Sequence, residues 1–450
     1  MLYRAKSIND LKIRFLGGKD GVGGNLILLK YKNSKIVLDI GVQFSKLAKF
    51  YTWPLRIPLG IEELINLGIA PKIDELYAVW NEKFELDLDK QRKTNIDGVF
   101  ISHYHLDHCY LLPQINRQIS IYMGETSKIL FEYYKKIKRR ERRGIWKPDK
   151  LENSIKTFRT GDEISCGEFK VTPIHVDHSI PGAYAFIIEC KNAVIAYTGD
   201  YRTHGPRKEL TSDFVKACKE RKPDLLITEG TNFFDVTSLT EKQVANELRK
   251  VIGKIKGTVL ASFGLKDVDR FNSYFKVAEE TGREMLMSYK QLLLLQHLKK
   301  KDFKLKKSIP DLSRNMVTAY YKSIRRSVEE ELMKDGFNLT CIREKVDSDM
   351  LKNKIVTSFA NILQEINLIN VPPETIAIFS ESEPIDEESE IELEKITNWL
   401  QHISTPSYRI HCSGHIYPWE LRSIVREINP GDVEVVHSNY PETLRNFVLK

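Results

Sequence analysis

The sequence lacks the features that mark membrane, secreted and disulfide-stabilised proteins. No apolar run approaches the roughly 18–20 residues that span a bilayer, so no membrane partner is expected. The first residues contain no apolar core of signal-peptide length, which predicts a cytoplasmic protein. The six cysteines are scattered and form no Cys-x-x-Cys pair, so we expect reduced thiols and no disulfide framework.

Length and charge restrict the function less. A chain of 450 residues is too long for one ordinary core, so two domains of unequal size are expected. Charged residues make up 29% of the chain and the net charge is +8. This balance is typical of a globular protein and allows an anionic partner such as nucleic acid without requiring one.

Eleven histidines are an ordinary number, but three of them lie in one stretch of six residues that also holds an aspartate: His103, His105, Asp107 and His108. The stretch follows the apolar run Ile96–Ile101, so it is predicted to form the loop at the end of a strand. Imidazole nitrogens and a carboxylate are ligands that zinc takes at about 2.0–2.2 Å. The loop therefore predicts part of a metal site.

Further metal-type ligands follow three other strand-like runs. The runs are Phe169–Val176, Ala193–Tyr197 and Val433–Val436, and the residues that follow them are His178, Asp200 and His437. A carboxylate placed like Asp200, after a glycine at a strand end, is able to bridge two cations. Four strand ends that each offer a ligand are more specific than any one motif.

These residues, preceded by Asp39, resemble the signature motifs of the metallo-β-lactamase superfamily in the family's own order. The resemblance implies an α/β fold, an αββα sandwich with a dinuclear zinc site along one edge of two packed sheets. Manganese is the alternative metal. It also implies one metal held by His103, His105 and His178, and a second held by Asp107, His108 and His437. Asp200 would bridge the two ions, and Asp39 would orient ligands from behind.

Three more segments are similar to the β-CASP nucleases of this superfamily. Glu229 ends a strand as in motif A, His411-Cys412-Ser413-Gly414-His415 resembles motif B of the ribonuclease J-like branch, and His437 corresponds to motif C. About 180 residues separate Glu229 from His411, the size of the inserted β-CASP domain. The implied domains are 1–230 for the first part of the metallo-β-lactamase core, 231–405 for the inserted α/β domain and 406–450 for the return to the core.

The expected function is that of a hydrolase. The resemblance implies a metal-dependent ribonuclease, 5′-to-3′ exonuclease or endonuclease, that cleaves single-stranded RNA with a hydroxide activated by two zinc ions. Asp107 and Asp200 would hold the metals for catalysis. His415 is the candidate general acid, and Glu229 is expected to orient it. A DNA-directed β-CASP nuclease and a non-cleaving, RNA-binding metalloprotein are the alternatives.

Substrate contacts are less sharply defined. Gly414 is expected at the substrate phosphate, and His411 and Ser413 either bind that phosphate or satisfy backbone groups in a tight turn. His204 either contacts a substrate phosphate or caps a turn.

Glu381 and Glu383 stand where a glycine- and serine-rich phosphate loop is expected, so the choice between exonuclease and endonuclease stays open. The sequence ends 13 residues after His437, so we expect no counterpart of ribonuclease J's extra C-terminal domain and leave the oligomeric state open. Two basic runs, 135–143 and 299–307, form either solvated helix faces or contacts with nucleic acid.

Overall fold

A computed structural model describes ten stretches of the chain: 4–51, 58–73, 75–79, 93–138, 155–233, 239–312, 316–342, 347–368, 371–381 and 387–450, with backbone only for 136–138 and 387–388. Most of the first basic run and Glu383 lie outside the described residues. The chain divides into two units. Unit 1 holds Met1–Thr203, Arg207–Val236 and Gly414–Lys450, and unit 2 holds His204–Pro206 and Thr237–Ser413.

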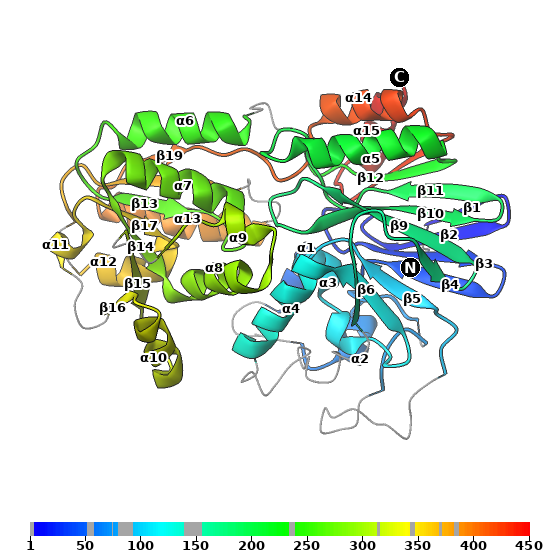
Figure 1. Cartoon of the computed structure of the whole chain (residues 1–450), viewed down its shortest axis with the longest axis horizontal. Coiled ribbons are helices and arrows are strands. Elements are labelled where there is room, and N and C mark those ends of the chain that lie inside the picture. The colour runs from blue at the N-terminus through cyan, green and yellow to red at the C-terminus, as the bar shows by residue number, and fades with distance from the viewer. Residues whose placement is uncertain are drawn as a thin grey trace. The chain divides into compact units, whose positions relative to one another are not determined.

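Unit 1 contains two β-sheets (Figure 1). The first has seven strands in sequential order: β1 (Arg4–Ile8), β2 (Leu11–Gly17), β3 (Leu26–Tyr31), β4 (Ser34–Leu38), β5 (Gly98–Ile101), β6 (Ser120–Gly124) and β7 (Ile155–Phe158). The second has six, in the order β20 (Val433–Val436), β12 (Leu225–Glu229), β11 (Ala193–Tyr197), β10 (Ala183–Cys190), β9 (Phe169–Val176) and β8 (Ile164–Cys166). Neighbours are parallel from β4 to β7 and from β11 to β20, and antiparallel elsewhere.

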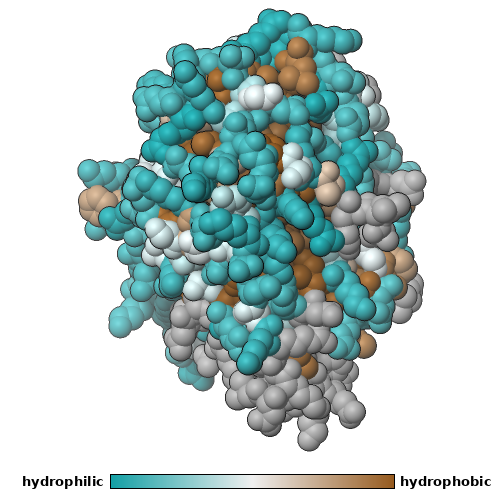
Figure 2. Space-filling view, turned by 90° about the vertical axis from the view of Figure 1, so that its right-hand side faces the viewer, coloured by the Kyte–Doolittle hydropathy of each residue, from teal (hydrophilic) through white to brown (hydrophobic). Residues whose placement is uncertain are grey.

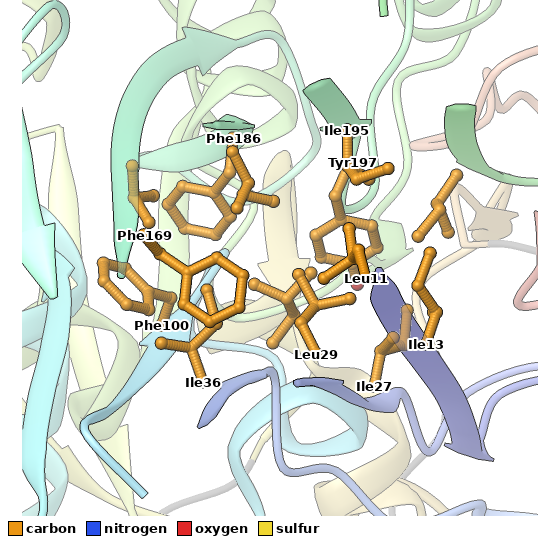
Figure 3. Close-up of a cluster of buried hydrophobic side chains, with 14 of the residues drawn as sticks. Leu11, Ile13, Ile27, Leu29, Ile36, Phe100, Phe169, Phe186, Ile195 and Tyr197 are labelled. Carbon is orange, nitrogen blue, oxygen red and sulfur yellow. The ribbon is translucent and has the colours of Figure 1, made fainter. Parts of the chain in front are cut away.

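Alternate side chains of both sheets meet in one buried core (Figure 3). On β2, Leu11, Ile13 and Phe15 point inward, as the period of two along a strand requires. Across the core Phe100 of β5 packs edge-on against Phe186 of β10, with ring centroids 5.9 Å apart. Burial of these aromatic and branched side chains fixes the register of the strands, because a slip by one residue would expose them.

Helices cover the outer faces of unit 1, which completes the four layers of the αββα sandwich (Figure 1). Their bounds are α1 (Phe44–Ala48), α2 (Ile61–Asn66), α3 (Leu106–Cys109), η1 (Leu112–Gln114), α4 (Glu125–Lys138), α5 (Lys208–Arg221), α14 (Pro418–Ile428) and α15 (Pro441–Leu449). Helices α5, α14 and α15 pack apolar faces on the second sheet, and α4 lies against β6 and β7. The α/β fold class predicted from the sequence is confirmed.

Unit 2 is built on a parallel sheet of seven strands. Their order is β16 (Asn338–Cys341), β15 (Val317–Tyr321), β14 (Glu284–Ser288), β17 (Lys354–Thr357), β13 (Val259–Ser262), β18 (Ile376–Phe379) and β19 (Ser407–Arg409). The helices are α6 (Glu241–Ile252), α7 (Val268–Thr281), α8 (Tyr289–Lys301), α9 (Leu305–Ser308), α10 (Arg326–Lys334), α11 (Ser348–Leu351), η4 (Phe359–Ile362), α12 (Leu363–Ile366) and α13 (Glu387–His402). Strands that alternate with helices give this layered parallel arrangement.

Local sequence explains where the helices of unit 2 begin. Thr240 and Gln243 form a capping box at the start of α6, in which the Thr240 hydroxyl accepts from the Gln243 amide at 3.2 Å. Asp267 caps α7 by accepting from the Arg270 amide at 2.9 Å. The segment 302–370, which the sequence indicated to be rich in helix and lysine but did not place, also contains β15, β16 and β17. In the sheet, β16 and β15 are neighbours, and β14 separates β15 from β17.

The surface shown in Figure 2 is mostly hydrophilic, with small apolar areas separated from one another. Scattered apolar side chains are ordinary on a globular protein. Within the described ranges, no helix has both the length and the apolar character needed to cross a bilayer.

Candidate active site

The candidate site lies in unit 1, where the carboxyl ends of strands from both sheets meet. Six strands lead to residues that the sequence singled out. Glu229 is the last residue of β12. The other five residues follow their strands within three positions: Asp39 after β4, His103 after β5, His178 after β9, Asp200 after β11 and His437 after β20. The short helix α3 adds Asp107 and His108. The sheet edge thus gathers side chains that are hundreds of residues apart in the sequence.

The donor atoms form two neighbouring groups. In the first group, Nδ1 of His105 lies 3.0 Å from Nε2 of His103 and 3.1 Å from Nε2 of His178. The second group consists of Asp107, His108, Asp200 and His437. Within it, Nε2 of His437 lies 3.0 Å from Oδ2 of Asp107.

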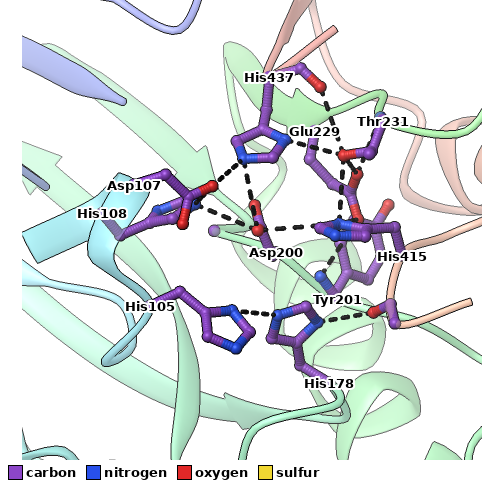
Figure 4. Close-up of polar contacts among 12 residues, drawn as sticks. His105, Asp107, His108, His178, Asp200, Tyr201, Glu229, Thr231, His415 and His437 are labelled. Carbon is purple, nitrogen blue, oxygen red and sulfur yellow. Dashed lines mark hydrogen bonds and ion pairs between the residues drawn. The ribbon is translucent and has the colours of Figure 1, made fainter. Parts of the chain in front are cut away.

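Asp200, a member of the second group, lies on the side of that group that faces the first (Figure 4). Its Oδ2 atom is 3.7 Å from Nε2 of His103 in the first group, and 3.1 Å and 3.6 Å from Nε2 of His108 and His437 in the second. One carboxylate oxygen therefore faces nitrogens of both groups, which is the geometry that a bridging ligand needs.

Asp39 fixes the orientation of two of the histidines. Its buried carboxylate is 2.8 Å from Nδ1 of His108 and accepts hydrogen bonds from the Ser102 amide and hydroxyl at 2.7 and 2.8 Å and from the Tyr197 hydroxyl at 2.6 Å. The Ser102 oxygen is in turn 3.0 Å from Nδ1 of His103. Because each Nδ1 has an acceptor on its outer side, the Nε2 atoms of both rings face the centre.

The same device orients two more of the predicted ligands, through groups to which the sequence gave no such role. Nδ1 of His178 donates to the Gly414 carbonyl at 2.6 Å. Nδ1 of His437 lies 2.8 Å from the Thr231 hydroxyl, which itself donates to Glu229 at 2.7 Å. Four of the five histidines in the two groups thus turn Nε2 inward, and His105 turns Nδ1 inward.

Distances and unsatisfied atoms show that these residues fit a metal. Nitrogens bound at 2.0–2.1 Å to a tetrahedral ion lie about 3.3 Å apart, close to the spacing in the first group. Both Asp200 carboxylate oxygens and Nε2 of His108 are buried without a regular hydrogen bond among the described residues. Buried carboxylates are costly unless they are paired or bind a metal, so the donor set suits a cation.

Charge in the site also favours cation binding. Burial lowers the pKa of His103 well below its ordinary value, and burial together with the nearby His415 lowers the pKa of His178 to about 3. Although burial would raise the pKa of Asp107, His108 and His437 hold it well below its usual range. Burial would lower the pKa of His108, but Asp200 and Asp39 raise it well above its ordinary value, so the carboxylates of the second group favour positive charge there. Neutral imidazoles and ionised carboxylates are the forms that bind metal ions, so a cation would replace the proton of His108.

A glycine-rich loop of the first sheet supports α3 from behind. The amides of Gly24 and Asn25 donate to the Asp107 carbonyl at 3.0 and 3.2 Å. A Cβ atom on Gly41 would lie 1.5 Å from the same carbonyl oxygen, so only glycine fits there. The loop therefore supports the backbone of the helix that carries Asp107 and His108.

His415 and Glu229 lie together beside the two groups. Nδ1 of His415 is 3.2 Å from Oε1 of Glu229 and 3.1 Å from the Thr231 hydroxyl. The fully buried Glu229 carboxylate also accepts from the amides of Thr231 and Ile416. Burial alone would lower the pKa of His415, but Glu229 and Asp200 raise it to about 9. The ring is therefore held in one orientation with a proton on Nδ1.

Three of the predicted substrate residues, His204, His411 and Ser413, belong to unit 2, and Gly414 belongs to unit 1. Nε2 of His204 lies 2.8 Å from the Ser413 carbonyl, and His204 is not among the grouped metal donors of the described chain. Nδ1 of His411 lies 3.3 Å from a guanidinium nitrogen of Arg270. Burial and this guanidinium lower the pKa of His411 to about 3.

Arg270 is a buried residue that sequence reasoning missed. Its guanidinium pairs with Glu241 at 2.9 and 3.1 Å and donates to the carbonyls of Ser380 and Cys412 at 2.5 and 3.3 Å. The Cys412 thiol donates to Glu241 at 3.1 Å. The pair therefore fixes the backbone that carries His411, Cys412 and Ser413.

We expect Asp39→Asn to weaken metal binding about 10–100-fold, because an amide cannot accept all the hydrogen bonds that hold His103 and His108 in place. Metal affinity measured by competition with a chromogenic chelator tests this. Tyr197→Phe, which removes one donor to the same carboxylate, should have a smaller effect. Equal metal affinities for wild type and Asp39→Asn would show that Asp39 does not orient the ligands.

We expect Glu241→Gln to lower the free energy of unfolding by about 3–5 kcal/mol, because it leaves the buried Arg270 charge without its counter-charge. Chemical denaturation provides the measurement. The matched control is Glu280→Gln, since Arg249 and Glu280 form an exposed pair between the same two helices, α6 and α7. The exposed pair should matter little. Similar effects at both positions would contradict the structural role assigned to Arg270.

Comparison with known proteins agrees with this geometry. Residues 78–236 match the model of the β-lactamase superfamily domain. Over these residues the chain is similar to the metallo-β-lactamase superfamily. A solved structure, described as a protein of unknown function from Enterococcus faecalis V583, shares the fold with a TM-score of 0.72. It is 23% identical in sequence, and the match covers 96% of this chain and 95% of that one.

Curated relatives named Ribonuclease J match the chain, in agreement with the resemblance of its motifs to the ribonuclease J-like branch. Ribonuclease J of Mycoplasma pneumoniae is 21% identical over 97% of this chain and 69% of its own length. Ribonuclease J of Mycoplasma genitalium is 24% identical over 62% of this chain and 44% of its own length. Ribonuclease J of Thermus thermophilus is 23% identical over 92% of this chain and 66% of its own length. The matches thus cover from 44% to 69% of the length of these relatives.

Proposed function

We propose that the chain is a metal-dependent ribonuclease that hydrolyses phosphodiester bonds of single-stranded RNA, acting in RNA processing or decay in the cytoplasm. The observation that carries the proposal is the placement of Asp200 between two groups of oriented donors, with His415 and Glu229 beside them. The first group would hold one Zn²⁺ and the second group another, with Mn²⁺ as the alternative metal.

Two bound divalent cations would supply a water activated for attack and positive charge near the phosphate. The residues around them do the positioning. Asp39, Ser102 and Thr231 hold the ligand rings at fixed angles, so little reorganisation is needed during the reaction.

His415 is proposed to move the proton. Glu229 and Thr231 contact Nδ1. We therefore propose that the other ring nitrogen, Nε2, donates the proton to the leaving oxygen. Glu229 favours the protonated ring, while two bound cations would lower its pKa through like charge and bring it closer to neutral pH. A proton is then available at the nitrogen that faces substrate.

RNA is the proposed substrate because the relatives are named Ribonuclease J and because the residue at motif C is a histidine, as in RNA-acting members of the family. Phosphate binding by His411, Ser413 and Gly414 is part of the proposal. Since Arg270 donates to Nδ1 of His411, the proton of the neutral ring lies on Nε2, which makes that nitrogen a donor for a phosphate oxygen. The Ser413 carbonyl holds His204 close to the same loop.

The experiment uses matched single-stranded RNA and DNA of one sequence, labelled at the 3′ end, with either a 5′-monophosphate or a 5′-hydroxyl. Each is incubated with the Zn²⁺- or Mn²⁺-loaded protein and resolved on a sequencing gel. Cleavage of RNA supports the proposal, with stepwise 5′ shortening for an exonuclease and discrete internal cuts for an endonuclease. Cleavage of DNA alone would contradict RNA as the substrate. Binding of RNA without cleavage of either polymer would contradict the proposed nuclease activity.

A further inference from the structure

The chain between α8 and α9 of unit 2 (Figure 1) presents an aromatic ring among lysines. The Phe303 side chain is 80% exposed. Four exposed lysines lie within four residues of it in the chain, and together with Phe303 they form what we call the lysine patch: Lys301, Lys304, Lys306 and Lys307. An exposed phenylalanine leaves apolar area in water, which is unfavourable unless something covers it.

Packing below the patch shows that the exposure of Phe303 is built into the fold. Leu298, Leu305 and Ile309 are buried on the inner side of the segment. Backbone hydrogen bonds tie the segment together, from the amides of Asp302 and Lys306 to the carbonyls of Leu298 and Asp302 at 2.8 and 2.9 Å. Since its neighbours are anchored, Phe303 is directed outward by the backbone and not by fraying of a helix end.

The one carboxylate of this segment does not offset the lysines at the surface. Asp302 is buried, and its Oδ1 atom accepts hydrogen bonds from the amides of Lys304 and Leu305 at 2.9 and 3.1 Å. The acid thus caps the start of α9 from the inside. Positive charge and an aromatic ring are left on the outer side.

The lysines of the patch also differ from the two that precede them. Lys299 donates to the Pro310 carbonyl at 2.7 Å, and Lys300 pairs with Asp335 at 2.7 Å. Within the described residues, no carboxylate pairs with any of the four patch lysines. Their charges therefore add to a local positive potential that attracts an anionic chain.

We propose that the lysine patch is a second binding site for single-stranded RNA, in which a base stacks on Phe303 and neighbouring phosphates pair with the lysines. An aromatic face among cations is the arrangement that grips single-stranded nucleic acid without regard to sequence. The inference rests on the proposed function for its choice of RNA. The inference goes beyond the proposed function because the lysine patch uses none of the residues of the metal centre.

Affinity for a single-stranded oligoribonucleotide with phosphorothioate linkages, which slow hydrolysis, is measured by fluorescence anisotropy with the Zn²⁺-loaded, full-length protein. Phe303→Ala should weaken binding about 5- to 100-fold. The double variant Lys304→Gln, Lys307→Gln should reduce the slope of log affinity against log salt by about 1.4. Leu368→Ala, at a position that is 82% exposed, and the double variant Lys254→Gln, Lys276→Gln are the matched controls and should change neither quantity.

Equal RNA affinity in the patch variants and their controls would overturn the proposal. Phe303-dependent binding to phosphatidylserine vesicles without an effect on RNA would also overturn it, and would make the patch a membrane contact. The small substrate bis-p-nitrophenyl phosphate separates the two proposals. If Phe303→Ala loses RNA affinity but keeps this hydrolysis, both stand. If the wild type binds RNA through Phe303 but hydrolyses neither substrate, only the proposed function fails.

Discussion

Replacing Asp200 with alanine is expected to reduce RNA cleavage by about 10³-fold or more, because the loss of several kcal/mol of metal-based stabilisation corresponds to at least three powers of ten in rate. In the part of the chain that the structure describes, Asp200 is the one carboxylate that faces nitrogens of both donor groups. The variant should also lose bound metal, which mass spectrometry of the purified protein measures alongside the cleavage rate.

Asp213→Ala is the matched control, since Asp213 is exposed on α5 and contacts Lys216 at 3.4 Å. This variant should keep both its metal content and its activity. If the Asp200→Ala variant, after chelation and dialysis, cleaved RNA at the wild-type rate, the reaction would not depend on this metal centre.

Replacing His415 with glutamine is expected to lower kcat by about 10²–10⁴-fold while the metal content stays unchanged. The expectation follows from the contacts of Nδ1, which lies near Glu229 and Thr231 and 3.7 Å from Oδ2 of Asp200. A residue that transfers a proton is needed for turnover but not for holding the ions.

His402→Gln, at an exposed position on α13, serves as the control and should leave kcat unchanged. Since His415 also lies close enough to Asp200 and His178 to share a cation with them, metal analysis decides between the two roles. Loss of metal in His415→Gln would make it a ligand and remove it as the proposed acid.

The positions of the donors were predictable because apolar runs in the sequence show where strands end. Apolar runs before His103, His178, Asp200 and His437 place these residues at carboxyl ends of strands, and the family resemblance supplied the sandwich. The orientation of the donors was not predictable. It depends on the Ser102 and Thr231 hydroxyls and on the Gly414 carbonyl, and such groups occur throughout any sequence.

The interior of unit 2 was harder to predict for a related reason. An inserted α/β domain was expected from the resemblance, and α6, β13, α7 and β18 show its alternating helices and strands. Charged residues on helices usually face water, so Glu241 and Arg270 gave no sign of a buried pair. The short strands between residues 302 and 370 carry too few residues to show a period of two clearly.

Two divalent cations in this site are proposed to drive RNA cleavage. A titration tests this: it starts from metal-free protein, adds Zn²⁺ or Mn²⁺ in steps, and follows both bound metal and cleavage of a single-stranded RNA. We expect no cleavage without metal and a rate that rises and levels off at two bound ions per chain. Full cleavage by the metal-free protein, or a fully loaded protein that leaves the RNA intact, would contradict the proposal.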